Sequence, residues 1–162
     1  MRNDLPELDR FDLAILDVLA EEGRISVADL ARRIGLSKSP TQARLRRLEA
    51  DRVITGYRAL IDPIRLGFDH VAFVEVRLSD TREKSLADFN AAVARIGEIE
   101  QVHLIAGSFD YLMKVRTSSM TEYRIVLAEK ISTLPHVSST STYMAMQAVK
   151  EVGLSAPREN VI

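Results

Sequence analysis

The chain has 162 residues, of which 46% are apolar and 28% charged, a balance that is ordinary for one globular domain or two small ones. It contains no cysteine, which excludes disulfides and thiolate metal sites. The first thirty residues lack the apolar run of a signal peptide, and no apolar run approaches the roughly 20 residues of a membrane span. We therefore expect a cytoplasmic protein with no membrane insertion.

Charge is unevenly distributed, although the net charge is only −1. Residues 1–31 carry three basic and eight acidic side chains, a net charge of −5. Residues 32–58 carry eight basic and two acidic side chains, a net charge of +6. A local basic stretch of this kind is typical of a surface that contacts phosphates, with a solvated basic face as the ordinary alternative.

Two short helices are predicted before the centre of the basic stretch. Asp9 is the expected cap of the first helix, which buries Ile15 and runs until Gly23. Ser26 is expected to begin the second helix, and Gly35 to end it. A third helix follows after only a few residues, and such a pair joined by a tight glycine turn is the helix-turn-helix arrangement.

The third helix is predicted within residues 37–50. Ser39 is expected to cap it, Pro40 suits the first helical position, and Gln42 completes a Ser-x-x-Gln capping box. At about 100° per residue, Leu48 lies on a narrow packed side, and basic residues lie on the other sides. The residues expected to contact DNA are Lys38, Ser39, Gln42 and Arg46 at base edges, Arg44, Arg47, Arg52 and Arg58 mainly at phosphates, and Thr41.

Two β-rich runs follow the third helix. Residues 53–54 and 57–61 flank Thr55-Gly56 and are expected to form a small hairpin, or wing. Asp62-Pro63 and Gly67 then interrupt the pattern, which indicates a linker. The predicted organisation is a winged helix-turn-helix domain at 1–61, a linker at 62–69 and a second domain at 70–162.

The second domain has the order β-α-β-β-α-β. Its strands are expected at 71–78, 101–106, 111–117 and 137–150, with one helix ending at Gly97 and another capped by Ser119. This order is typical of a ferredoxin-like fold, so the chain is predicted to be α+β. Such a fold leaves one sheet face without helices, and we expect a second copy to cover it.

These elements resemble the Lrp/AsnC family of bacterial and archaeal transcription regulators over nearly the whole chain. The matching segments are residues 8–12, 15–16, 23–26, 30–31, 35–37, 46–49, 54–57, 62–63, 107–112, 134–135 and 140–143. The C-terminal half is most similar to the leucine-responsive subtype. The resemblance implies a DNA-binding regulator built from dimers, often an octamer associated with the nucleoid, whose C-terminal domain senses an amino acid and controls amino-acid metabolism genes.

The loop at Gly107 to Asp110 resembles the effector loop of that family. Asp110 offers a carboxylate suited to an amino group, with a simple turn-capping role as the alternative. Hydroxyl and thioether side chains on one face of the last strand are expected to complete the pocket. The predicted effector-binding residues are Ala106, Gly107, Ser108, Phe109, Asp110, Tyr111, Thr140, Thr142 and Met144. A small apolar amino acid is the expected effector, leucine first and proline or another branched residue next.

No catalytic or metal site is predicted. His70, His103 and His136 are scattered without ligand spacing, and the sequence has no phosphate-binding loop signature. We therefore expect neither an enzyme nor a cofactor. Two alternatives to a regulator remain, an architectural DNA-binding protein and an oligomerisation module, and the second leaves the +6 stretch unexplained.

Overall fold

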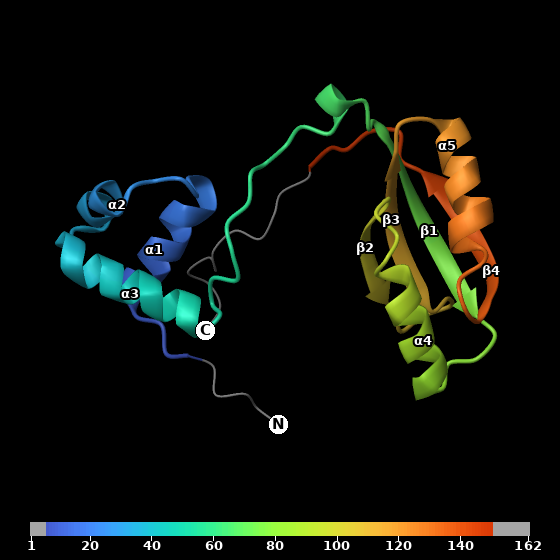
Figure 1. The fold of residues 1–162 in the computed structure, drawn as a ribbon, viewed down its shortest axis with the longest axis horizontal. Helices are drawn as coiled ribbons and strands as arrows, with labels where there is room; N and C mark the ends of the chain where they lie inside the picture. Colours follow the sequence, from blue (N-terminus) through green and yellow to red (C-terminus); the bar gives the residue numbers. More distant parts are fainter. Residues whose placement is uncertain (1–5, 151–162) are drawn as a thin grey trace. The chain divides into compact units, whose positions relative to one another are not determined.

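The computed structural model describes residues 6–150, which divide into two compact units between Leu60 and Ile61 (Figure 1). The first unit contains three helices, α1 (Arg10–Glu21), α2 (Val27–Ile34) and α3 (Lys38–Ala50). The second contains a four-stranded sheet with its helices. The α+β fold class, helix-turn-helix followed by a ferredoxin-like domain, is confirmed.

The ends of α1 and α2 follow from local sequence. The Asp9 carboxylate accepts hydrogen bonds from the Phe11 and Asp12 N–H groups at 2.8 and 3.0 Å, and the Asp12 carboxylate accepts one from the Asp9 N–H at 3.1 Å. This reciprocal capping box satisfies donors that the first helical turn leaves open. Ser26 caps α2 through the Asp29 N–H, and Gly35 ends it at φ +72°. Both helix starts and the glycine turn are as predicted.

The start of α3 differs from the prediction by two residues. Ser37 is the N-cap, its side chain makes no capping hydrogen bond, and Pro40 lies at the third helical position. Proline is tolerated there because the first four N–H groups of a helix have no intrahelical acceptor. The predicted capping box of Ser39 and Gln42 is therefore wrong. The side chains of Ser39 and Gln42 therefore do not cap α3.

One buried side chain from each helix forms the centre of the first unit. Ile15 of α1, Leu30 of α2 and Leu48 of α3 are at most 1% exposed and pack together. Partly buried apolar side chains surround them, including Leu45 of α3. This packing fixes α3 by one narrow stripe and leaves most of its circumference outside the core.

The predicted wing is not a hairpin, since residues 51–69 contain no strand. The backbone turns sharply after α3, and Tyr57 then donates a hydrogen bond from its hydroxyl to Glu49 at 3.0 Å. Burial, together with the Glu49 carboxylate, raises the pKa of Tyr57 to about 12. A two-stranded ribbon without a third strand has marginal stability, which explains why β-rich sequence alone does not form one here. A short 3-10 helix, η1 (Ile64–Leu66), follows.

The second unit is an antiparallel sheet in the order β2-β3-β1-β4. Its strands are β1 (His70–Leu78), β2 (Ile99–Leu104), β3 (Tyr111–Thr117) and β4 (Val137–Met144). Its helices are α4 (Glu83–Val93) and α5 (Met120–Ile125), which continues as the π-helical segment η2 (Val126–Ile131).

Four element ends described here differ from the prediction. The last strand ends at Met144 instead of Lys150, because Met144 pairs with Ala72 close to the start of β1, and the Ala145 N–H makes one further hydrogen bond, to the Val71 carbonyl, next to His70, the first residue of β1. The strand predicted at 101–106 lies at 99–104, and α4 ends at Val93 rather than near Gly97. Strand ends are fixed by pairing partners, which local sequence does not specify.

The two faces of the sheet differ in burial. Val74 and Val76 of β1, with Met113 of β3, are fully buried against α4 and α5. Phe73 and Tyr143, which are register partners on the opposite face, are 38% and 55% exposed. The alternation predicted for β1 is therefore confirmed, and the described helices cover one face only.

Candidate nucleic-acid interface and effector loop

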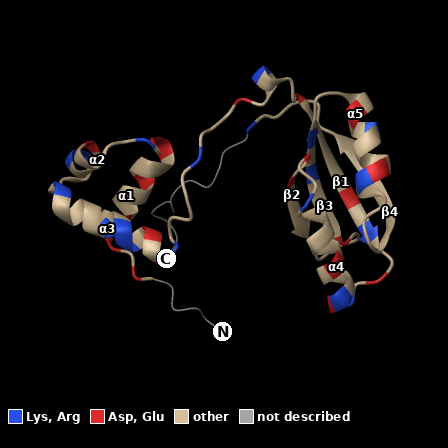
Figure 2. Cartoon of the chain, in the orientation of Figure 1, with Lys and Arg blue, Asp and Glu red and all other residues tan. Residues whose placement is uncertain are grey.

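The basic side chains of residues 32–58 fall into two groups of four. Figure 2 shows basic residues on α3 and acidic residues on α1, and several of these residues form ion pairs with one another. The paired group is Arg32 with Asp29, Arg33 with Glu22, Arg44 with Asp9 and Asp12, and Arg47 with Asp12. The +6 charge of the sequence therefore overstates the positive surface that is free to bind an anion.

The other four cations are exposed and have no ion pair with any residue between 6 and 150. They are Lys38, Arg46, Arg52 and Arg58. Ser39 is exposed and Gln42 is half-buried, so both have surface available next to Lys38 and Arg46. The outward side of α3 thus presents the side chains expected at base edges, with donors and acceptors suited to bases and cations suited to phosphates.

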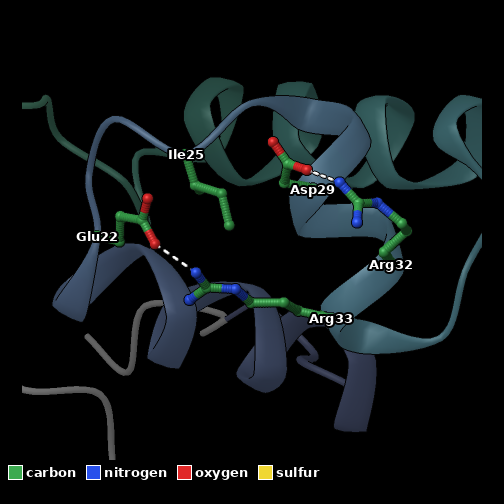
Figure 3. Close-up of a pocket in the computed structure, with 5 residues that line it drawn as sticks. All are labelled: Glu22, Ile25, Asp29, Arg32 and Arg33. Atoms are coloured by element: carbon green, nitrogen blue, oxygen red, sulfur yellow. Dashed lines mark hydrogen bonds and ion pairs between the residues drawn. The ribbon is translucent and has the colours of Figure 1, made fainter.

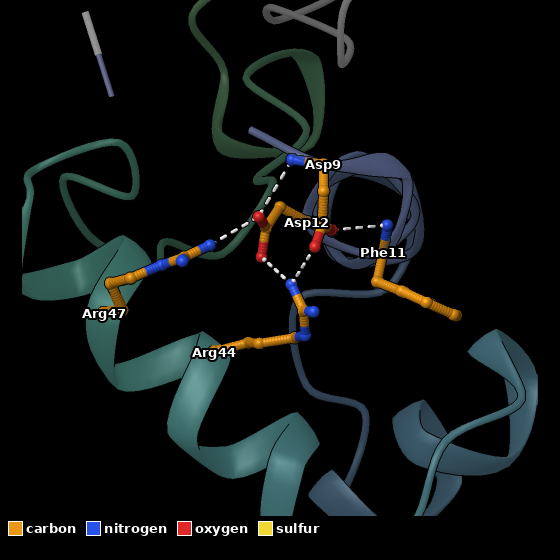
Figure 4. A network of polar contacts seen from close by, with 5 residues as sticks. All are labelled: Asp9, Phe11, Asp12, Arg44 and Arg47. Atoms are coloured by element: carbon orange, nitrogen blue, oxygen red, sulfur yellow. Dashed lines mark hydrogen bonds and ion pairs between the residues drawn. The ribbon is translucent and has the colours of Figure 1, made fainter. Parts of the chain in front are cut away.

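A buried carboxylate joins α1 to α3 (Figure 4). Asp12 has no exposed surface, and its two oxygens accept from Arg44 Nη1 at 2.9 Å and Arg47 Nη2 at 2.5 Å. Arg44 Nη1 also lies 2.7 Å from the Asp9 carboxylate. The hydrogen bonds to Asp9 and then Asp12 raise the pKa of Arg44, while the N–H of Asp12 and then Arg44 lower the pKa of Asp9.

Three residues predicted to contact DNA therefore have internal partners. Thr41 is fully buried, and its hydroxyl donates to the Ser37 carbonyl at 2.9 Å, so it has no surface for DNA. Arg44 is 26% exposed and held by two carboxylates. Arg47 is 49% exposed and held by one. Asp12 was not among the predicted residues, although its position three residues before the buried Ile15 places it on the inward face of α1.

A shallow hollow of about 380 Å³ lies between the end of α1 and α2 (Figure 3). It is lined by Ile25 and by two acidic and two basic side chains, Glu22, Asp29, Arg32 and Arg33. Arg33 pairs with Glu22 at 2.5 Å, and Arg32 pairs with Asp29. The Arg33–Glu22 pair links the end of α1 to α2, whereas the Arg32–Asp29 pair lies within α2. Because these charges neutralise one another within the hollow, they do not indicate a ligand.

Arg52 has an unusual backbone for its residue type. After α3, the Val53 N–H donates to the Leu48 carbonyl at 2.9 Å and the Arg52 N–H to the Glu49 carbonyl at 3.1 Å. This closure requires a left-handed residue, and Arg52 has φ +55°. α2 closes with the same pattern, but with Gly35 at the left-handed position. An arginine there costs stability relative to glycine, because its Cβ crowds the left-handed backbone.

The predicted effector loop connects β2 to β3 and is fixed to β1 through Asp110. The Asp110 N–H donates to the Val76 carbonyl at 2.9 Å, and its carboxylate Oδ2 accepts from the Leu78 N–H at 2.7 Å. The Ile105 N–H donates to the Asp110 carbonyl at 2.8 Å and closes the loop. Asp110 therefore has a structural role, and within residues 6–150 its Oδ1 has no hydrogen-bond partner.

The other predicted effector residues lie in two different environments. Ala106, Gly107 and Ser108 are exposed on the loop, and Phe109 is half-buried beside them. Tyr111 is buried and donates its hydroxyl to Asn90 of α4 at 2.9 Å.

The three predicted residues of the last strand share one face, as expected. Thr140, Thr142 and Met144 are register partners of Val76, Val74 and Ala72, all of which point toward the helices. Thr142 Oγ1 lies 2.5 Å from the Tyr123 hydroxyl of α5, and Met144 packs against the core. The expectation that Thr142 and Met144 form a ligand wall is therefore not met within one chain, because that face is covered by helix.

Within residues 6–150 no group of three acidic or histidine side chains is arranged to hold a metal ion. In the same part of the chain, no helix is long and apolar enough to cross a membrane.

Comparison with known families gives two matches that follow the division of the chain. The model described as winged helix-turn-helix DNA-binding matches residues 8–55. The model described as Lrp/AsnC ligand binding domain matches residues 71–154. The two matches coincide with the two units in which the exposed cations and the effector loop lie.

Relatives with similar sequences are transcriptional regulators. The chain is 59% identical over 148 residues to the proline dehydrogenase transcriptional activator of Rhizobium radiobacter, covering 91% of this chain and 95% of the relative. It is 55% identical over 144 residues to the activator of the same name from Rhodobacter capsulatus, covering 89% and 94%. It is 43% identical over 145 residues to the leucine-responsive regulatory protein of Escherichia coli K12, covering 90% and 88%.

Solved structures with the same fold include a transcriptional regulator of Neisseria meningitidis in complex with L-Met, with a TM-score of 0.87 and 26% identity over 95% of this chain and 98% of that one. An AsnC family transcriptional regulator from Agrobacterium tumefaciens has a TM-score of 0.85 and 30% identity, covering 90% and 94%. The leucine response regulatory protein of Mycobacterium tuberculosis has a TM-score of 0.79 and 33% identity, covering 93% and 100%.

The left-handed backbone of Arg52 generates a prediction that separates stability from binding. Arg52→Gly should leave the free energy of unfolding unchanged or raise it by about 1 kcal/mol, because glycine adopts this backbone without a Cβ clash. The same substitution should weaken DNA binding and reduce the slope of log K against log salt by about 1, the effect of losing one phosphate contact. Urea denaturation and fluorescence anisotropy at several salt concentrations measure the two effects. Arg52→Ala is the control, since it removes the same charge without relieving the backbone, and equal destabilisation by both substitutions would contradict the argument.

Proposed function

Because the chain belongs to the Lrp/AsnC family of DNA-binding transcriptional regulators, a family without enzymatic activity, we propose that it reads its operator with the outward side of α3 and controls a gene of proline oxidation in response to proline. The observation that carries the proposal is the pair of proline dehydrogenase activators that match about nine tenths of this chain at 59% and 55% identity. Leucine is the second candidate effector, since a leucine-responsive relative matches at 43%.

The proposed DNA contacts follow the division of cations on α3. Arg46 and Gln42, with Lys38 and Ser39, have exposed polar atoms at the outward side of the helix and are assigned to base edges. Arg52 and Arg58, which follow the end of α3, are assigned to phosphates. Base contacts confer sequence preference, whereas phosphate contacts fix the register of the protein on the duplex.

This assignment is tested by comparing operator and random DNA. Arg46→Ala should weaken operator binding by about 1–3 kcal/mol and random binding much less, because an arginine bidentate to guanine discriminates between bases. Gln42→Ala should behave in the same way. Anisotropy titrations on a duplex selected by the wild-type protein and on a scrambled duplex give both affinities. Equal losses on the two duplexes would instead favour an architectural DNA-binding protein.

The effector is proposed to bind at the β2–β3 loop. The exposed residues Ala106, Gly107 and Ser108 share the loop with Asp110, whose Oδ1 can accept a hydrogen bond from the ammonium of an amino acid. The apolar side chain of the effector needs a wall that the loop does not supply. We infer that a second copy of the chain completes the pocket.

Asp110→Asn tests the proposed ammonium contact without removing the loop anchor, because an amide oxygen still accepts from the Leu78 N–H. The substitution should weaken proline binding about tenfold or more, since hydrogen bonds to charged groups are worth about 1.5–3 kcal/mol. Isothermal titration with proline and then leucine measures this, with Asp88→Asn on α4 as the matched control. Unchanged affinity in Asp110→Asn would move the effector site elsewhere, and tighter binding of leucine than proline would reverse the choice of effector.

Self-association is proposed through the sheet face that the described helices leave open. Phe73 and Tyr143 form an exposed apolar pair on this face, and large side chains of this kind are typical of buried interfaces. A dimer, with an octamer as the proposed higher assembly, would place two α3 helices on half-sites about 34 Å apart or at a multiple of that spacing. Bound to the chromosome in this way, the protein would be associated with the nucleoid.

Phe73→Lys should therefore weaken dimerisation, because it places a charge in the centre of the proposed interface. Sedimentation equilibrium should show monomer at concentrations at which the wild-type protein is dimeric or larger. Lys84→Glu, an exposed charge change on α4, should leave the assembly unchanged. A wild-type protein that sediments as a monomer and binds one half-site with full affinity would contradict the dimer.

A further inference from the structure

The ion pairs of Arg44 and Arg47 differ in how much of each guanidinium they occupy. Arg44 is 26% exposed, and the same Nη1 lies within 2.9 Å of both Asp9 and Asp12. Arg47 is 49% exposed and is paired through Nη2 with Asp12 alone among residues 6–150. A guanidinium has five N–H donors in a rigid plane, so Arg47 retains donors on its exposed side.

Asp12 can hold Arg47 in one orientation because the carboxylate itself cannot turn. Its Oδ1 accepts from Arg44, and its Oδ2 accepts from both Arg47 and the Asp9 N–H. The side chain is fully buried and is bonded at both oxygens. A planar guanidinium attached to a fixed carboxylate loses the freedom that an exposed arginine usually has, so less entropy is lost when its free donors bind an anion.

The position of Arg47 on α3 points to a phosphate as that anion. Successive residues differ by about 100° around a helix, so Arg47 lies on a flank of α3, about 100° from the outward Arg46 and about 100° from the packed Leu48. When the outward side of a recognition helix enters the major groove, its flanks lie near the phosphate backbone.

We propose that Asp12 is a positioning residue that orients Arg47 toward a DNA phosphate and thereby sets how α3 docks on the duplex. The inference rests on the proposed DNA-binding side of α3 and assigns a role in binding to a buried side chain of α1. Arg44 serves the same arrangement from inside, by neutralising Asp9 and holding the second oxygen of Asp12.

The salt dependence of DNA binding tests the proposal, because it counts phosphate contacts and does not respond to fold stability alone. Wild-type protein, Asp12→Asn, Arg47→Gln and the double variant are titrated on a duplex selected by the wild-type protein at 50–200 mM salt. Arg47→Gln should make the slope of log K against log salt shallower by about 0.9, and Asp12→Asn should do the same. The double variant should lose no more than either single one. Arg124→Gln, an exposed charge on α5, is the control and should keep the wild-type slope.

Each other outcome overturns the proposal. A normal slope in Asp12→Asn with a shallower slope in Arg47→Gln would show that Arg47 binds without positioning, and normal slopes in both would make the network purely internal. Failure of the wild-type protein to bind any duplex would instead reject the proposed DNA-binding side. Should Asp12→Asn fail to fold in a thermal melt, Arg47→Lys takes its place. Lysine keeps the positive charge but lacks the planar guanidinium that can bond the carboxylate and a phosphate at the same time. The affinity for DNA should therefore fall about fivefold or more at an unchanged salt slope. Wild-type affinity in Arg47→Lys would contradict the inference.

Discussion

The arrangement of the helix-turn-helix unit depends on one buried carboxylate. Asp12 lies on the inward face of α1 with no exposed surface, and Arg44 and Arg47 reach it from α3. Removal of the arginines and removal of the carboxylate would have unequal effects on the stability of the unit. Loss of both arginines would leave a buried, unpaired charge, a situation that typically costs about 3–5 kcal/mol. Loss of the carboxylate would leave two arginines that water already reaches. The carboxylate thus binds α3 to α1 across its polar flank, where the core of Ile15, Leu30 and Leu48 does not extend.

The second unit uses a carboxylate in a similar way. Asp110 joins the β2–β3 loop to the central strand β1 through its own N–H and through Oδ2. The loop therefore has a fixed base at Asp110 and an exposed crest at residues 106–108. An anchored base combined with free backbone is suited to recognition of a small ligand, since the polar groups are held in place before the ligand arrives. In the proposed effector contact, Oδ2 would keep the loop anchored while Oδ1, which has no hydrogen-bond partner within residues 6–150, would accept from the ligand.

Local sequence was sufficient to predict those features that depend only on residues close to one another in the chain. The Asp9 and Ser26 caps, the Gly35 turn, the alternation of β1 and the bounds of β3 follow from neighbouring residues. The start of α3 was missed because Ser37 and Ser39 both precede a run compatible with helix, and proline fits several positions of a first turn. The wing was wrongly predicted as a hairpin because strand formation depends on partners that β-rich sequence does not supply.

The candidate sites also depend on contacts between distant residues, which local sequence does not specify. The exposed positions of Lys38 and Arg46 agree with a helical rotation, which local sequence provides, whereas Arg52 and Arg58 lie beyond the end of α3. The pairing of Arg44 with Asp12 joins residues 32 positions apart, and so does that of Asp110 with the Leu78 N–H. Thr142 meets Tyr123 of α5 only because β4 lies beside β1 in the sheet. Contacts of this kind follow from topology, so local sequence indicates which residue types a site needs but not which partners those residues meet.

The left-handed arginine after α3 has a consequence for how the sequence can change over generations. α2 and α3 end in the same closure, with Gly35 in one and Arg52 in the other, so the domain contains its own comparison of a relaxed and a strained turn. In a gene copy released from the need to bind DNA, mutation to glycine at position 52 would be retained without harm to folding. If Arg52 contacts a phosphate as proposed, a single change to glycine would both relax the turn and remove a DNA contact, so selection for stability and selection for binding would favour different residues at this position.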